Sequence, residues 1–101
     1  MKVIRMNVKK ILKGIRVSNM ESSRGNEIPN QFIIRTDDAT IFQSYSTIIV
    51  VRTQGKTYLD KDSWAYSTTT GKYRNIFLGE DKKATERKIK SGEYILTKLN
   101  E

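Results

Sequence analysis

The segment at residues 31–59 constrains the fold most strongly, because it carries an almost unbroken pattern of strands and turns. Two stretches, QFIIRT and TIFQSY, flank the turn residues 37–39 and predict a β-hairpin. The run STIIVVRT is continuously apolar at its centre, as in a core strand or a strand buried on both faces. After a turn at Gln54 and Gly55, the residues KTYL pair back. Strands are therefore predicted at residues 31–36, 40–45, 46–53 and 56–59.

After Trp64 the pattern becomes helical. Tyr73, Ile76 and Phe77 recur at helical spacing and follow N-cap residue types. Asp81 can cap a second, lysine-rich helix, and glycines follow both segments as helix ends. Helices are predicted at residues 70–78 and 82–90, and a last strand at residues 94–99. The predicted fold is α+β: a small, mostly antiparallel sheet packed by two short helices, in one domain of 101 residues.

The first 20 residues form a basic N-terminal element that the sequence leaves ambiguous. Ile4, Val8 and Ile11 recur at helical spacing, which predicts a basic amphipathic helix at about residues 7–13, ended by Gly14. The many β-branched residues of the same block favour a strand instead. Residues 20–30 gather Ser, Gly, Asn and Pro and are predicted to be a loop.

The composition excludes several kinds of chemistry, since the chain has no cysteine and no histidine. Without cysteine there is no disulfide framework and no thiolate metal site, which fits a reducing cytoplasm. Without histidine, the commonest general base and a usual zinc ligand are missing. No apolar run approaches the roughly 18 residues of a membrane span. We therefore expect a cytoplasmic protein that is not an enzyme and has no cofactor, no bound metal and no membrane partner.

Positive charge is concentrated at both ends of the chain. Of the net charge of +8, residues 1–20 contribute +6, residues 21–60 contribute −1 and residues 61–101 contribute +3. Clustered lysine and arginine raise the local potential and release counterions from phosphates, which favours a polyanionic partner such as nucleic acid or a nucleotide. A soluble surface with a lysine bias has the same composition, and the sequence leaves both interpretations open.

Cations alternate with aromatic residues just after Trp64. Aromatic faces can stack on bases while cations hold phosphates. Large aromatic residues of small domains also build cores, so Trp64 and Phe77 are expected in the core, whereas Tyr66 and Tyr73 are left open. The predicted lysine-rich helix at residues 82–90 is by default a solvated surface. Contact of this helix with phosphate is the more specific hypothesis. The candidate nucleic-acid- or nucleotide-binding residues are Lys72, Arg74, Tyr66, Tyr73, Arg87, Lys9 and Lys13.

Two further patterns carry weaker signals. The triplet Thr70-Gly71-Lys72 resembles a fragment of a phosphate-binding loop, but the second glycine and the Ser or Thr after the lysine are absent, which argues against nucleotide hydrolysis. The close acid pairs Asp37 with Asp38, and Asp60 with Asp62, could bind a metal, but at these positions they are typical turn residues. Neither pattern predicts a catalytic or metal site.

The segments NQFII, FQSY, WAYSTTTGKYRNIFLGE and KIKSGEY together resemble a family of small uncharacterised proteins of tailed phages that infect Gram-positive bacteria. The resemblance covers about residues 26–100 and leaves out the first 20. Its pattern is NQFII, then FQSY, then W-x-YS-x-TTGKYRN-x-FLGE, and KIKSGEY.

This resemblance implies an origin and no particular activity, so no catalytic residue is carried over. It places the protein in the cytoplasm of the infected bacterial host. Three hypotheses fit such an origin: an accessory protein that binds a polyanion, an anti-defence inhibitor that docks on a host protein complex, and an oligomeric sponge that sequesters a cyclic nucleotide. The sequence does not give the oligomeric state.

Overall fold

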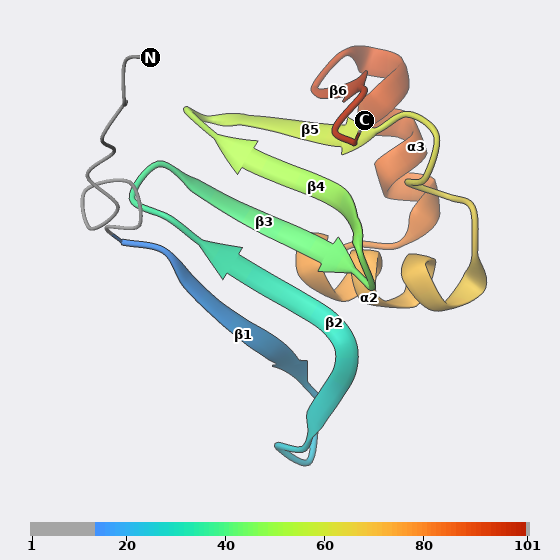
Figure 1. Cartoon of the computed structure of the whole chain (residues 1–101). Coiled ribbons are helices and arrows are strands. Elements are labelled where there is room, and N and C mark those ends of the chain that lie inside the picture. The colour runs from blue at the N-terminus through green and yellow to red at the C-terminus, as the bar shows by residue number, and fades with distance from the viewer. Residues whose placement is uncertain (1–13, 101) are drawn as a thin grey trace, which may run out of the picture.

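The computed structural model describes residues 14–100, which form one sheet with two helices (Figure 1). The predicted helix at residues 7–13 lies outside this range. The elements in chain order are β1 (Arg16–Glu21), β2 (Glu27–Arg35), β3 (Ala39–Ser44), β4 (Thr47–Thr53), β5 (Lys56–Asp60), α2 (Thr68–Leu78), α3 (Lys82–Ser91) and β6 (Tyr94–Thr97).

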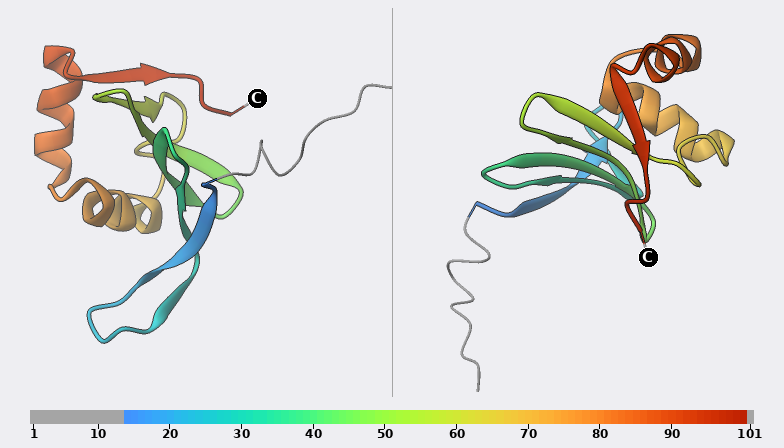
Figure 2. Two further views of the ribbon diagram at one scale, coloured as in Figure 1. Left: turned by 90° about the vertical axis from the view of Figure 1, so that its left-hand side faces the viewer. Right: turned by 90° about the horizontal axis from the view of Figure 1, so that it is seen from above.

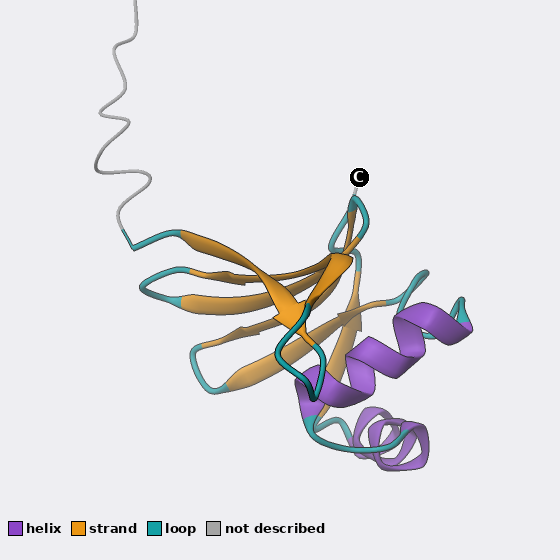
Figure 3. Ribbon diagram, turned by 90° about the horizontal axis from the view of Figure 1, so that it is seen from below, coloured by secondary structure: helices purple, strands orange, loops and turns teal. Residues whose placement is uncertain are grey.

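The strands lie in the sheet in the order of the sequence, β1-β2-β3-β4-β5-β6. The first five form an antiparallel meander, and β6 pairs parallel with β5 because the chain returns through α2 and α3. Both helices lie on one side of the sheet, as Figures 2 and 3 show. The α+β class, the mostly antiparallel sheet and the two helices are confirmed.

The strand β1 and the first half of β2 correct the predicted loop at residues 20–30. Here β1 pairs with β2 from Arg16 to Glu21. The hydroxyl of Ser22 closes the connecting turn by accepting hydrogen bonds from the amides of Arg24 and Asn26. Pro29 is tolerated because β2 pairs with β3 only from Gln31 onward. The last strand is also shorter than predicted and ends at Thr97.

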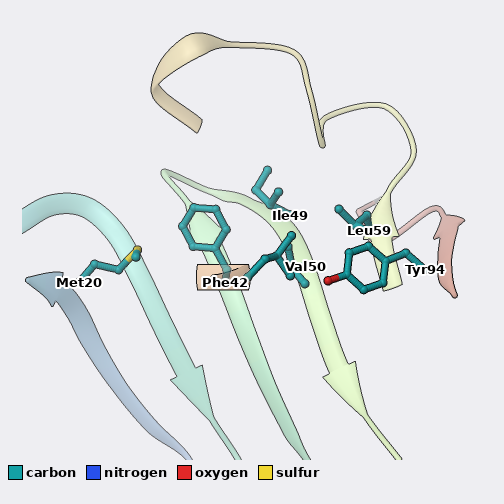
Figure 4. Packing of buried hydrophobic residues seen from close by; sticks show 7 residues of the cluster. Met20, Phe42, Ile49, Val50, Leu59 and Tyr94 are labelled. Carbon is teal, nitrogen blue, oxygen red and sulfur yellow. The ribbon is translucent and has the colours of Figure 1, made fainter. Parts of the chain in front are cut away.

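The core lies between the sheet and the helices (Figure 4). Phe42, paired with Val50 across β3 and β4, is at its centre and stacks on Phe77 with ring centroids 5.8 Å apart. The register shifts beside this pair, so β4 has one extra residue and both Ile49 and Val50 are buried. The buried apolar residues are Met20, Phe42, Ile49, Val50, Leu59, Leu78 and Tyr94.

The helix ends agree with the predicted caps. Ser67 accepts a hydrogen bond from the amide of Thr70 at the start of α2, and Asp81 does the same for Ala84 in α3. Gly79 and Gly92 end the helices in the left-handed conformation. Trp64 and Phe77 pack against the core as expected, whereas Ile76 of the same helical pattern is 56% exposed.

A polar network attaches α3 to the end of α2 and to β6. The carboxylate of Glu80 accepts hydrogen bonds from Lys88 (2.6 Å), Tyr94 (2.8 Å) and Thr85 (2.6 Å). Burial opposes ionisation of Glu80, but these three donors outweigh it and lower its pKa. Burial likewise opposes ionisation of Asp60, but hydrogen bonds donated by Leu99, Ser63 and Asn100 outweigh it and lower the pKa of Asp60.

These two carboxyl groups make the fold sensitive to acid. Because their pKa values are lower in the folded chain than in the unfolded one, the stabilisation is complete above the unfolded pKa values and is lost as pH falls through the folded ones. We expect the free energy of unfolding, measured by urea denaturation, to decline below about pH 5. The variant Glu80→Gln should show a shallower decline, and an equally steep one would contradict the role given to this network.

Candidate anion-binding site

The first turn of α2 carries partial positive charge that no acidic side chain in this turn neutralises. The first amides of a helix have no acceptor within the helix. The side chain of Ser67 accepts a hydrogen bond from one of them, the amide of Thr70. The amides of Thr68 and Thr69 precede it in the first turn, which contains no acidic residue. The helix dipole adds partial positive charge at this point, so the first turn of α2 favours an anion.

An open hollow of about 580 Å³ lies beside this turn. It is lined by Ala65, Tyr66, Ser67, Thr68, Gly71, Lys72, Arg74, Asn75 and Lys82. Lys72 reaches it from α2 and Lys82 from the first turn of α3, and both side chains are exposed. Three of the lining residues are cations and none is acidic, so the hollow attracts negative charge.

Arg74 holds its charge beneath the floor of this hollow, with a side chain only 1% exposed. Its guanidinium donates hydrogen bonds to the carbonyl of Trp64 and to Oδ1 of Asn75, and it lies 5.2 Å from the centre of the Trp64 ring. Its buried Nε has no partner. Burial lowers the pKa of Arg74, and the negative charges of Glu80 and Glu86 counteract that effect only in part.

Among the residues that the structure describes, no carboxylate lies within ion-pair distance of this guanidinium. In residues 14–100 the ion pair within 4.0 Å joins Lys88 to Glu80, and Arg74 is not part of it. A buried charge without an opposite charge is costly for a fold. Arg74 is therefore the residue in this region that most needs an anion nearby.

The triplet Thr70-Gly71-Lys72 lies inside α2 and is not a phosphate-binding loop. The hydroxyl of Thr70 is buried against Ser44 of β3 at 3.1 Å, and the amide of Gly71 is bonded to the carbonyl of Ser67. A side chain on Gly71 would start 3.6 Å from the guanidinium of Arg74. Gly71 therefore places no side chain against the guanidinium.

The structure brings together three of the predicted binding residues, Tyr66, Lys72 and Arg74, at this hollow. Tyr66 is 57% exposed. Tyr73 lies on another side of α2, packed against the core, with the ammonium of Lys72 5.4 Å from its ring centre.

The other predicted residues are placed elsewhere. Arg87 is exposed on α3 and does not line the hollow. Lys9 and Lys13 lie outside the described residues. The prediction of Arg74 as a surface contact is corrected, because its side chain is buried and can act only through its charge.

Sequence reasoning missed Lys82 and Asn75 as members of this site. Lys82 follows the predicted cap Asp81, so its place in the first turn of α3 was predictable, but its approach to α2 depends on how the two helices pack. No sequence pattern marks Asn75 as part of the site, since its side chain acts by accepting a hydrogen bond from Arg74.

Other kinds of site are less well supported. Within residues 14–100 no group of three acidic residues could hold a metal ion. None of the helices in the same range is long and apolar enough to cross a membrane.

Comparison with known protein families gives a match. A family of unknown function, DUF8033, matches residues 15–93. The chain belongs to the DUF8033 family. The DUF8033 match runs from the residue before β1 to the residue before β6, and it includes every residue that lines the hollow. No curated protein and no solved structure matches the chain.

Proposed function

We propose that this protein binds a phosphate group of a nucleic acid or nucleotide in the hollow at the start of α2, without catalysing a reaction. The observation that carries the proposal is the buried guanidinium of Arg74, which has no carboxylate partner within residues 14–100 and lies under a hollow lined by two lysines. An anion in the hollow would add to the partial compensation that Glu80 and Glu86 give to this charge.

Each part of the hollow has a function in this proposal. A phosphate group would accept hydrogen bonds from the amides of Thr68 and Thr69 at the helix start. Lys72 and Lys82 would contact its oxygens from α2 and α3, as charge-assisted donors. Arg74 would add attraction from below without contact, since its charge acts over several ångströms in a region of low dielectric.

Tyr66 suits a ligand that carries a base as well as a phosphate. Its ring is exposed at the rim of the hollow, where a base could stack on it. The hollow is open, so a phosphate of a longer strand could enter as readily as that of a mononucleotide. The net charge of +8 would draw either ligand to the protein.

Removing the two lysines tests the proposal. We expect the double variant Lys72→Ala and Lys82→Ala to bind a fluorescent single-stranded oligonucleotide roughly 100-fold more weakly, because two charge-assisted hydrogen bonds are lost. Both side chains are exposed, so the fold should be unaffected.

The matched control removes the same charge from another place. Lys61 and Lys98 are exposed and do not line the hollow. The double variant Lys61→Ala and Lys98→Ala should lose only the few-fold affinity that follows from lower net charge. Equal losses in the two double variants would show that the ligand is held by overall charge and would contradict the site.

A pull-down from bacterial lysate, with and without nuclease, separates this function from docking on a host protein. Nucleic acid that disappears after nuclease treatment supports the proposal. A protein partner that survives the nuclease and is retained by the variant lacking Lys72 and Lys82 would favour the inhibitor hypothesis instead.

A further inference from the structure

Three arginines stand in one row across the sheet. The row joins the register partners of the strands β1 to β5 and consists of Arg16, Arg35, Thr40, Arg52 and Thr57. Register partners of antiparallel strands lie on the same face of a sheet, and the guanidinium of Arg52 lies 5.7 Å from the centre of the Phe77 ring of α2. The row is therefore on the face that carries the helices, beside the last turn of α2.

The positive charge of this arginine row is not neutralised by the fold. In residues 14–100 no carboxylate lies within 4.0 Å of the three guanidinium groups, those of Asp37 and Asp38 in the following turn included. Arg35 is exposed, whereas Arg52 is half-buried and donates a hydrogen bond from Nε to the hydroxyl of Thr57 at 3.3 Å. Three arginines without an acid among their register partners attract an anion.

A second hollow, of about 280 Å³, opens between the arginine row and α2 and is called the arginine hollow below. Arg35 and Arg52 line it together with apolar side chains, among them Ile76 and Phe77 of α2. Guanidinium groups bind phosphate through paired hydrogen bonds. The arginine hollow therefore offers a phosphate two cations, beside an apolar wall that suits a base.

A middle hollow of about 470 Å³ joins the arginine hollow to the hollow at the start of α2. It lies between α2 and the turn after β1, which contributes Ser22 and Ser23. Lys72 lines both the first hollow and the middle one, and Ile76 lines both the middle one and the arginine hollow. Thr68, Lys72 and Ile76 are four residues apart in α2 and exposed, so they form one side of the helix. The three hollows therefore follow one another along this side of α2.

The middle hollow differs from its two neighbours in charge. Ile28, Tyr73 and Ile76 give it an apolar wall, and its charged residues, Lys72 and Glu21, are of opposite sign. The path along α2 thus has cationic ends and a middle without net charge. A nucleic acid strand matches this order, because its phosphates can lie at the ends while a base between them stacks on an aromatic ring such as that of Tyr73. An acidic polypeptide would instead bring carboxylates to Glu21.

We propose that the ligand is a single strand of nucleic acid, which runs along this side of α2 from the hollow at the helix start to the arginine row. The inference rests on the proposed phosphate site and extends it from one phosphate to a polymer. Lys72 and Lys82 hold a phosphate at one end of the path, and Arg35 and Arg52 hold another at the far end.

The length of the path excludes a mononucleotide as a ligand of both ends. From Thr68 to Ile76 the helix rises about 12 Å, and a stacked strand advances about 3.4 Å per nucleotide, so the two ends are roughly four nucleotides apart. A strand of two or three nucleotides reaches one end of the path, and a strand of six or more spans it.

The dependence of affinity on strand length tests the path in the full-length chain. Fluorescence polarisation compares labelled trithymidylate, which fills the first hollow alone, with labelled decathymidylate, which reaches the arginine row. We expect decathymidylate to bind roughly 100-fold more tightly, because two charge-assisted contacts are added. The salt slope should steepen from about −1.4 to about −2.8, as the neutralised phosphates rise from about two to about four. Decauridylate identifies the sugar that the path prefers, and such binding of either polymer supports the proposal.

The double variant Arg35→Gln and Arg52→Gln should lose most of the advantage of decathymidylate and keep the affinity for trithymidylate. The control Arg87→Gln and Lys90→Gln removes the same charge from exposed positions of α3 outside the three hollows, and it should keep the advantage. Because Arg52 also packs on Phe77, the single variant Arg35→Gln, whose side chain is exposed, gives a second measurement. We expect it to bind decathymidylate about tenfold more weakly than the wild type.

The outcomes separate the path from the phosphate site on which it rests. If trithymidylate binds but decathymidylate has no advantage, or keeps its advantage without Arg35 and Arg52, the path is overturned and the phosphate site stands. If neither oligonucleotide binds, both are overturned. Decathymidylate binding that needs the arginines but not Lys72 and Lys82 would contradict a continuous path. Displacement of decathymidylate by polyglutamate as effective as that by unlabelled decathymidylate would show that the row takes carboxylates, and would overturn the proposal as well.

Discussion

Saturation with a short single-stranded oligonucleotide is expected to raise the Tm of the wild-type protein by roughly 10 °C. A ligand at about one hundred times its Kd stabilises a fold by about 2.7 kcal/mol, and 1 kcal/mol shifts the Tm of a domain of this size by about 4 °C or more. The stabilisation arises because the bound phosphate supplies a negative charge above the buried guanidinium of Arg74.

The variant Arg74→Met separates this effect from general binding. Methionine fills similar space without charge, so at the same oligonucleotide concentration we expect less than half of the wild-type shift. Ligand-free Arg74→Met loses the hydrogen bonds to Trp64 and Asn75 but also loses a buried charge that is only partly compensated, so its own Tm is the reference for its shift. A full shift in Arg74→Met would contradict the function given to Arg74.

Replacing Phe42 with alanine is expected to lower the free energy of unfolding by about 3–5 kcal/mol. Phe42 is fully buried, pairs with Val50 and stacks on Phe77 of α2, so its loss leaves a cavity where the sheet meets the helices. Urea denaturation followed by circular dichroism measures the change.

The control for this experiment is Ile76→Ala on the exposed side of α2, which should change the free energy of unfolding by less than about 0.5 kcal/mol. If Phe42→Ala costs no more than this control, the core does not lie where the structure places it. The oligonucleotide shift of Phe42→Ala should persist while the variant is folded, since Phe42 does not line the hollow.

The sequence predicted those parts of the fold that local patterns determine. The hairpin of β2 and β3 follows from alternation and a turn, and both helices are framed by capping residues and glycines that act within a few positions. The sequence left the first 20 residues open between helix and strand, and β1 was not predicted with its bounds, because RVSNME is polar and weakly patterned and its place in the sheet depends on pairing with β2. The parallel pairing of β5 with β6 is likewise a result of how α2 and α3 pack.

The candidate site was predictable to a similar extent. Tyr66, Lys72 and Arg74 were identified from their residue types, and the start of α2 at Ser67 explains why they meet. The burial of Arg74 could not be predicted, because it results from contacts with Trp64 and Asn75 that form when the helix packs. The approach of Lys82 also depends on tertiary packing, which the spacing of charges does not encode.

The central claim is that the hollow at the start of α2 binds phosphate. Fluorescence-polarisation titration of the wild type with a labelled single-stranded oligonucleotide, repeated from about 50 to 500 mM salt, tests it most directly. With about two phosphates neutralised by Lys72, Lys82 and the helix start, the logarithm of affinity should fall with the logarithm of salt at a slope near −1.4. Undetectable binding at the lowest salt, or an affinity that salt does not change, would contradict the claim.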